Sequence, residues 1–212
     1  MITVIPSIAS ADPLRIHDEM ARVASIKKLH LDIEDGNFIN NITFGRKTVA
    51  AIANVWRGEV DAHLMVMTPL EYVDWLAESG VASVCAHLEA LPYPKLFLAR
   101  CREQGMRAGL AVNLKIHPGE VASYAEDLDY LLVMTSEPDG REQSFFPDAA
   151  ERVAAFRALT PPQAEIWCDG GITPAHLPKL YAAGMDVAIM GRAVFSADNP
   201  VDAVRTYEIS VM

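Results

Sequence analysis

The stretch Lys28-Leu-His-Leu-Asp-Ile-Glu-Asp-Gly-Asn-Phe38 has the pattern of a strand that runs into a turn and carries a carboxylate at its C-terminal end. Side chains at positions i and i+2 of a strand share a face, so His30 and Asp32 point the same way. A second stretch, Glu165-Ile-Trp-Cys-Asp-Gly-Gly-Ile172, repeats this form with Asp169 before a glycine turn. Both stretches therefore place polar, reactive side chains where a strand ends.

Short apolar runs of the same kind alternate with helical segments along the whole chain. Eight of these runs are predicted strands: Thr3–Ser7, Lys28–Ile33, Val60–Met65, Ser83–His87, Ala108–Val112, Tyr130–Met134, Glu165–Cys168 and Val187–Met190. About eight βα units are the count of a closed parallel α/β barrel, the (β/α)8 or TIM barrel. The alternative is an open doubly wound sheet, but the Gly-x-Gly-x-x-Gly turn typical of its first strand is absent from the sequence.

The segments between the strands carry helix signals. The amphipathic stretches are Pro69–Ser79, Tyr93–Gln104, Pro147–Leu159 and Pro174–Ala183, and a further helix is predicted within Val201–Tyr207. Asp12-Pro13 and Thr173-Pro174 have the pattern of a helix cap followed by a proline at the first helical position. Because no linker or low-complexity tract interrupts the pattern, residues 1–212 are predicted to form one domain.

The composition limits the functions that this chain can have. Its 212 residues, 51% of them hydrophobic, suffice for one well-buried domain. A net charge of −10 argues against nucleic acid and anionic membranes as partners, whereas local backbone dipoles can still bind a small anionic metabolite. The three scattered cysteines form neither a disulfide framework nor a zinc-finger spacing. With no signal peptide or membrane-spanning run in the sequence, we expect a cytoplasmic protein.

Four polar residues fall at the C-terminal ends of predicted strands, where barrels carry their active sites. They are His30, Asp32, His63 and Asp169. Two histidines and two aspartates can close a site for a divalent transition metal, and the two carboxylates can also serve as an acid/base pair. Taken singly, each has an ordinary explanation as a structural histidine or a helix cap. Because all four are expected at the same end of the barrel, a functional site is favoured.

Glycines follow the last two predicted strands. Asp169-Gly170-Gly171 comes after the seventh strand and Met190-Gly191-Arg192 after the eighth. Many barrels bind phosphate with these two loops and a helix N-terminus. The alternative is that the glycines only make tight turns.

Seven motifs lie along the chain in one order: Pro6-Ser-Ile-Ala-Ser10, His30-Leu-Asp-Ile-Glu-Asp-Gly-Asn-Phe38, Asn41-Ile-Thr-Phe-Gly45, Ala62-His-Leu-Met65, His87-Leu-Glu-Ala90, Leu132-Val-Met134 and Asp169-Gly-Gly-Ile172. Together they resemble the ribulose-phosphate 3-epimerase family over nearly the whole chain. The resemblance implies a TIM barrel of the ribulose-phosphate-binding type.

The resemblance also implies roles for individual residues. One divalent metal ion per chain would be held by His30, Asp32, His63 and Asp169, with Asp32 and Asp169 also transferring protons. Zinc is our first choice of ion, and iron(II), manganese and cobalt also suit the ligand set. Residues expected to contact the substrate are Ser7, His63, Met65, Met134, Asp139, Gly140, Arg141, Gly170, Gly171, Gly191 and Arg192. For the two methionines, the alternative is a place in the barrel core.

Three features depart from the family pattern. Glu34 stands where the family usually has methionine, and strand parity places it on the face of His30 and Asp32. In the segment 138–143, Asp139 and Glu142 would repel a phosphate that glycine N–H groups usually bind, and Arg141 would compensate. Arg192 replaces a small residue. It either takes over part of the phosphate binding or is a solvated charge at a helix start.

The expected function is that of a metal-dependent ketose-phosphate 3-epimerase acting on D-ribulose 5-phosphate and D-xylulose 5-phosphate. One alternative substrate is a hexulose phosphate such as D-allulose 6-phosphate. An alternative of another class is a sugar-phosphate-binding protein without turnover. A metal-independent decarboxylase fits less well, because such enzymes need a lysine beside the acidic cluster. We expect a small-molecule partner and a homo-oligomer, a dimer or larger.

Overall fold

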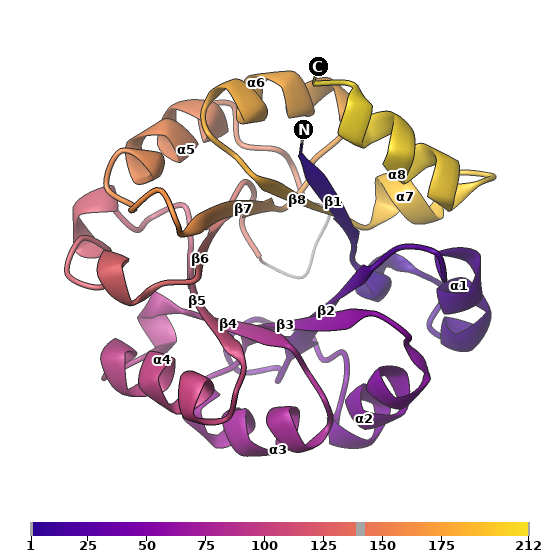
Figure 1. The fold of residues 1–212 in the computed structure, drawn as a ribbon, viewed down its shortest axis with the longest axis horizontal. Helices are drawn as coiled ribbons and strands as arrows, with labels where there is room; N and C mark the ends of the chain where they lie inside the picture. The colour runs from indigo at the N-terminus through magenta and orange to yellow at the C-terminus, as the bar shows by residue number, and fades with distance from the viewer. Residues whose placement is uncertain (1, 139–142, 212) are drawn as a thin grey trace.

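The computed structural model describes residues 2–138 and 143–211, which form a barrel of eight parallel strands surrounded by helices (Figure 1). The strands are β1 (Thr3–Pro6), β2 (Lys28–Glu34), β3 (Glu59–Met65), β4 (Ser83–His87), β5 (Arg107–Val112), β6 (Tyr130–Met134), β7 (Glu165–Asp169) and β8 (Val187–Met190). Hydrogen bonds link them in the order β1-β8-β7-β6-β5-β4-β3-β2. An isolated parallel bridge between Ser7 and His30 joins the two ends of this order. The predicted (β/α)8 TIM barrel is confirmed.

Each predicted strand is present, with bounds within one residue of those expected. The agreement has a physical cause. The strands of a closed parallel barrel are covered by helices outside and by packed side chains inside, so most of them are apolar runs, whereas β2 and β3 carry polar residues at alternate positions.

The helices cover the outside of the barrel (Figure 1). They are α1 (Ile16–Arg22), α2 (Arg46–Val55), α3 (Val73–Glu78), α4 (Pro94–Glu103), α5 (Ala149–Arg157), α6 (Leu177–Ala182), α7 (Arg192–Phe195) and α8 (Pro200–Ile209). Short 3-10 turns are η1 (Ile8–Ser10), η2 (Pro69–Tyr72), η3 (Leu88–Ala90), η4 (Pro118–Glu120), η5 (Ala125–Asp127) and η6 (Pro174–His176).

One connection lacks the α-helix of a complete βα unit, and one predicted helix cap differs from the structure. The connection from β5 to β6 holds the turns η4 and η5 in place of an α-helix, since Pro118 and Gly119 both disfavour a helix interior. At the start of the chain, α1 begins at Ile16, and the Asp12 side chain accepts the Leu14 N–H at 3.0 Å in the turn before it. The predicted cap at Asp12 is therefore wrong. The cap at Thr173, ahead of η6, is confirmed.

The strands separate two packed regions. Side chains such as Leu29, Leu31 and Ile33 pack between the sheet and the helices. A smaller cluster fills the barrel itself, and in it the rings of Tyr130 and Trp167 stack with centroids 4.2 Å apart. Gly109 makes room for this pair, because a Cβ atom there would lie 2.8 Å from the Tyr130 ring. This packed interior forms the floor beneath the C-terminal ends of the strands.

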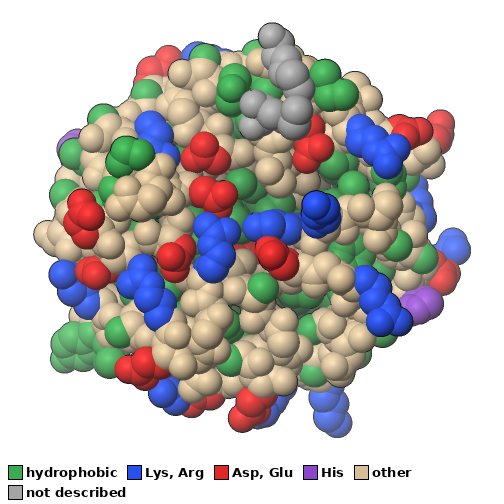
Figure 2. All heavy atoms as spheres, in the orientation of Figure 1, with side chains coloured by type: hydrophobic (Ala, Val, Ile, Leu, Met, Phe, Trp, Pro, Cys, Tyr) green, Lys and Arg blue, Asp and Glu red, His purple; other side chains and the backbone are tan. Residues whose placement is uncertain are grey.

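Charged side chains lie at the first residues of several strands. Lys28 pairs with Glu59 at 3.0 Å, and Arg107 pairs with Glu165 at 2.7 Å. Glu165 also accepts a hydrogen bond from the Trp167 indole N–H. These charges therefore lie at the N-terminal ends of the strands, at the end of the barrel opposite the four predicted ligands. Figure 2 shows positive and negative side chains interleaved over the centre of the face toward the viewer. Half-exposed ion pairs contribute only about 0–1 kcal/mol each, so interior packing dominates the stability of this end.

The remaining expectations concern cysteines and membranes. Cys85, Cys101 and Cys168 are all buried and unpaired. Within residues 2–138 and 143–211, every helix is too short or too polar to cross a membrane.

Candidate metal centre

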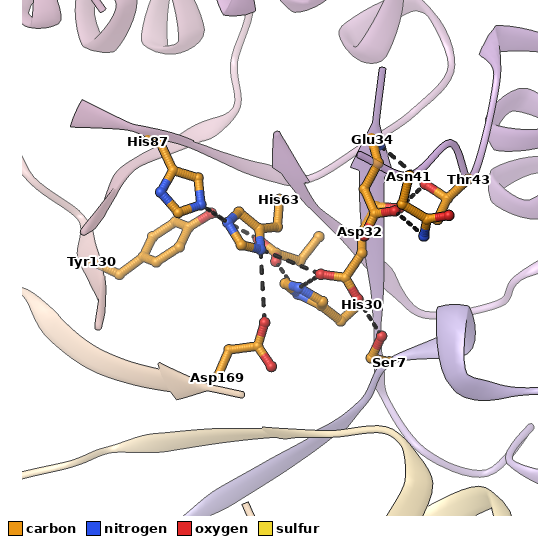
Figure 3. Close-up of polar contacts among 11 residues, drawn as sticks. Ser7, His30, Asp32, Glu34, Asn41, Thr43, His63, His87, Tyr130 and Asp169 are labelled. Atoms are coloured by element: carbon orange, nitrogen blue, oxygen red, sulfur yellow. Dashed lines mark hydrogen bonds and ion pairs between the residues drawn. The ribbon is translucent and has the colours of Figure 1, made fainter. Parts of the chain in front are cut away.

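The four predicted metal ligands come together at the C-terminal end of the barrel (Figure 3). His30 and Asp32 come from β2, His63 from β3 and Asp169 from the end of β7. Each offers one donor atom, and all four atoms lie within 4.8 Å of one another. The register explains part of this convergence, since Asp32 and His63 are direct partners across the β2–β3 pair.

Asp32 lies at the centre of the cluster. Its Oδ1 atom is 3.2 Å from His30 Nε2 and 3.3 Å from His63 Nδ1, and its Oδ2 atom accepts the Ser7 hydroxyl at 2.5 Å. Burial raises the pKa of Asp32, but the two histidines outweigh it and hold the pKa well below its ordinary value. Asp169 Oδ2 lies 3.7 Å from His63 Nδ1 on the other side.

Both histidines are fully buried among these carboxylates. Burial lowers the pKa of His30, but Asp32 and Asp61 outweigh it and hold the pKa well above its ordinary value. Burial likewise lowers the pKa of His63, and contacts with Asp169 and Asp32 raise it overall. The surroundings of both rings therefore favour positive charge at this point.

A divalent cation fits this arrangement. The donor set consists of two imidazole nitrogens and two carboxylate oxygens, which suits zinc, iron(II), manganese or cobalt. His30 Nδ1 is bound to Asp61 and His63 Nε2 to His87, so each ring has its other nitrogen directed at the cluster. Histidine ligands in metalloproteins have this pattern of an engaged outer nitrogen. The cluster is therefore consistent with a divalent metal site.

A cavity of about 680 Å³ opens above the cluster. Asp32 and Asp169 line it, and so do six of the predicted substrate-contact residues: Ser7, Met65, Met134, Gly171, Gly191 and Arg192. His63 lies below the lining, and Gly170 is not part of it. Asp139, Gly140 and Arg141 lie outside the described residues. The structure thus gathers most of the predicted contacts around one space.

The glycines after β7 have a packing role. Gly170 and Gly171 have φ values of 110° and 65°. A Cβ atom on Gly170 would lie 2.3 Å from Ser136 Oγ, and one on Gly171 would lie 3.0 Å from the Gln143 carbonyl oxygen. The tight-turn interpretation therefore accounts for Gly170, whereas Gly171 both makes the turn and borders the cavity.

Arg192 and Glu34 stand at the cavity wall. The Arg192 guanidinium donates to the Gln143 carbonyl at 3.2 Å, which holds it beside the cavity. Glu34 accepts the Asn41 amide at 2.5 Å and is not one of the four clustered donors. Burial and the negative charge of Asp32 raise the pKa of Glu34 to about 7. The third carboxylate therefore lines the cavity without joining the donor set.

Several residues of the site were given no role from the sequence, although Asn41, Thr43 and His87 lie in the motifs quoted above. They are Asn41, Thr43, Asp61, Ser83, His87, Tyr130 and Gln143. A signal existed for Asp61, which precedes His63 by two residues on β3 and so shares its face. Tyr130 gave none, because its contact with Asp61 joins strands 69 residues apart in the chain.

The fold and the cluster define a TIM-barrel protein with a candidate metal centre at the C-terminal rim. Two solved structures share the fold: orotidine 5'-phosphate decarboxylase from Pyrococcus horikoshii OT3 (TM-score 0.69, 16% identity, covering 100% of this chain and 99% of that one) and 3-hexulose-6-phosphate synthase from Salmonella typhimurium (TM-score 0.72, 18% identity, covering 99% and 98%). At these identities they show the fold alone.

The sequence comparisons are more specific. The model of the ribulose-phosphate 3 epimerase family matches residues 3–195. A ribulose-phosphate 3-epimerase of Schizosaccharomyces pombe is 33% identical over 214 residues, covering 99% of this chain and 93% of that protein. The Synechocystis protein of the same name is 33% identical over 211 residues, covering 96% and 91%. The chain belongs to the ribulose-phosphate 3-epimerase family.

Proposed function

We propose that the protein is a metal-dependent ketose-phosphate 3-epimerase that interconverts D-ribulose 5-phosphate and D-xylulose 5-phosphate. One observation carries this proposal: two carboxylates, Asp32 and Asp169, reach the same cavity from β2 and β7, which lie on different sides of the barrel (Figure 1). Inversion of a carbon centre needs one group to remove a proton from one face and another to deliver a proton to the opposite face.

The chemistry follows from these two positions. One aspartate takes the C3 proton of the substrate, and the electron pair left behind forms an enediolate with the neighbouring carbonyl. The other aspartate, protonated, gives its proton to C3 from the opposite face. His30, Asp32, His63 and Asp169 would hold a divalent ion, which would supply Lewis acidity toward the substrate oxygens, and we take zinc as that ion.

Other side chains prepare the cavity for this reaction. Ser7 holds Asp32 through its hydroxyl and lies within reach of a bound sugar. Met65 and Met134 present thioether side chains to the same cavity. Their apolar surface would keep water away from the planar intermediate, where a stray proton could be delivered to the wrong face.

A decarboxylase mechanism has less support, although one such enzyme shares the fold. The lysine on β2, Lys28, lies at the far end of the barrel, pairs with Glu59 and is 5.8 Å from the Trp167 ring centroid. Among the described residues, no lysine lines the cavity. A hexulose phosphate such as D-allulose 6-phosphate stays as the alternative substrate, because the same two carboxylates would serve it.

Deuterium exchange at C3 tests the proposed function. The metal-loaded protein is incubated in D2O with D-ribulose 5-phosphate, D-xylulose 5-phosphate and D-allulose 6-phosphate in turn, and proton NMR follows C3. We expect loss of the C3 proton signal together with appearance of the C3 epimer for the pentulose phosphates. Exchange with the hexulose phosphate alone would make D-allulose 6-phosphate the substrate in place of the pentulose phosphates. A lack of exchange with all three would leave a binding protein without turnover.

Arg192 is expected to carry a large part of the phosphate affinity. Its guanidinium stands at the cavity wall beside Gly191 and Gly171, and it can pair with an anionic oxygen. Loss of a hydrogen bond to a charged group costs about 1.5–3 kcal/mol, or roughly tenfold to a hundredfold in affinity. Arg192→Ala should therefore weaken a phosphorylated ketose by that factor in calorimetric titrations.

The unphosphorylated ketose is the internal control for Arg192→Ala, and its weak affinity should stay unchanged. Arg205→Ala is a matched control variant, because Arg205 is an exposed arginine on α8 that pairs with Asp202 and not with the cavity. Unchanged affinity for both ligands would make Arg192 only a surface charge, and equal weakening of both would place its contact at the sugar and not at the phosphate.

A further inference from the structure

Each of the two histidine ligands has one ring nitrogen that points away from the cluster and is bound to a second buried side chain. His30 Nδ1 is 2.6 Å from Asp61 Oδ2. His63 Nε2 is 2.8 Å from His87 Nε2, and Figure 3 shows these two rings. All three rings are fully buried, and Asp61 is only 1% exposed. Water therefore cannot replace either partner, and each histidine depends on the protein to fix which of its nitrogens carries a proton.

For His30, the contacts of Asp61 show which ring nitrogen carries the proton. Asp61 accepts from the Ser83 hydroxyl at 2.6 Å and from the Tyr130 hydroxyl at 2.8 Å, both at Oδ1. Its Oδ2 atom accepts the hydrogen bond that His30 Nδ1–H donates. The Nε2 atom of His30 is therefore left with a lone pair on the cluster side, as a metal ligand requires.

On the His63 side, the partner is a second histidine. Two ring nitrogens 2.8 Å apart form a hydrogen bond only if one carries a proton and the other a lone pair. To bind a cation, His63 needs its lone pair on Nδ1, which faces Asp32 and Asp169. Its proton must then be on Nε2, with the lone pair of His87 Nε2 as acceptor. The proton of His87 is left on Nδ1, 3.8 Å from Glu89 Oε2.

We propose that His87 is a positioning residue whose Nε2 atom accepts a hydrogen bond from His63 Nε2–H, and so keeps the Nδ1 lone pair of His63 directed at the metal cluster. This inference rests on the proposed metal-dependent function. Packing holds the His87 ring in place for the task, because the Phe38 ring lies on it with centroids 4.8 Å apart. His87 lies beneath the cavity lining and has no access to a substrate there.

Two substitutions separate this role from simple packing. His87→Leu fills the space but removes the acceptor, which leaves the His63 Nε2–H buried and unpaired or drives the proton to Nδ1. His87→Gln keeps an acceptor oxygen. Loss of a partner that orients a metal ligand typically costs about tenfold to a hundredfold in metal affinity. We expect that loss in His87→Leu and affinity within about threefold of the parent in His87→Gln.

Cobalt(II) chloride is the probe, titrated against a competing chelator while the visible absorption of bound cobalt is recorded. His87→Leu should also shift the cobalt absorption bands, which a loosened fold alone would not. Val84→Ala is the control, because Val84 is a fully buried neighbour on β4 that packs toward the helices. It should lower the melting temperature and leave cobalt affinity unchanged.

A measurement on the parent keeps the inference testable if His87→Leu does not fold. Nitrogen-15 NMR of the zinc-loaded parent should show His63 protonated at Nε2 and His87 protonated at Nδ1. A proton on His63 Nδ1, or equal cobalt affinity in a folded His87→Leu and the parent, would overturn the role of His87. A parent that exchanges C3 protons but binds no cobalt or zinc would instead refute the metal dependence of the proposed function.

Discussion

Asp32→Asn and Asp169→Asn are each expected to lower the rate of epimerisation by about 10²–10⁴-fold, the usual contribution of a positioned general acid or base. Asparagine has nearly the shape of aspartate but neither takes nor delivers a proton under these conditions. The rates should be measured at saturating metal, with bound metal verified, because both side chains are also candidate ligands. Asp74→Asn, at an exposed position on α3, should keep parental turnover.

The two variants should also differ from each other. The pentulose phosphates present their C3 protons to opposite faces, so each aspartate removes the proton of only one epimer. In D2O, Asp32→Asn and Asp169→Asn should lose C3 exchange in different epimers. Loss of exchange in the same epimer, or near-parental turnover in either metal-bound variant, would contradict the scheme of two aspartates.

His63→Ala is expected to reduce metal binding to well below one ion per chain. The imidazole provides one of four clustered donors, and its Nδ1 atom lies between Asp32 and Asp169. A direct ligand should matter at least as much as an outer partner, whose loss costs about tenfold to a hundredfold in affinity. Elemental analysis after dialysis against a dilute zinc buffer measures the effect.

His17→Ala is the matched control for His63→Ala. The His17 side chain is 79% exposed on α1, far from the clustered donors, so its loss should not change the metal content. Unchanged stoichiometry in His63→Ala would remove this histidine from the ligand set and leave a site of three donors.

The sequence predicted the strands well, and the ligands with them. Most strands that are buried on both faces are short apolar runs, and polar residues that share one face of a strand then stand out against them. His30 and Asp32 stand out in this way, two residues apart on β2. The barrel topology then brings the strand ends together without further information, so four residues from three strands could be assigned to one place.

The partners of those ligands could not be predicted in the same way. Tyr130 and His87 sit in runs where an aromatic or polar residue has several ordinary explanations, and their contacts depend on the register of distant strands. Gly109 is informative only once Tyr130 is known to lie against it. The start of α1 was missed for a local reason, since an aspartate before a proline closes a turn as readily as it caps a helix.

The seam between β1 and β2 has a consequence for how the protein persists in the cell. Among the described residues, that seam has one backbone bridge, between Ser7 and His30, with the Ser7 hydroxyl bond to Asp32 beside it. The candidate ligands lie on β2 and β3 to one side of it and on β7 to the other. An ion bound by residues of these strands would link the two sides of the seam between β1 and β2. A ligand bound only by the native state stabilises it in proportion to the logarithm of its free concentration. Scarcity of the ion would thus shorten the lifetime of the folded chain as well as slow its chemistry.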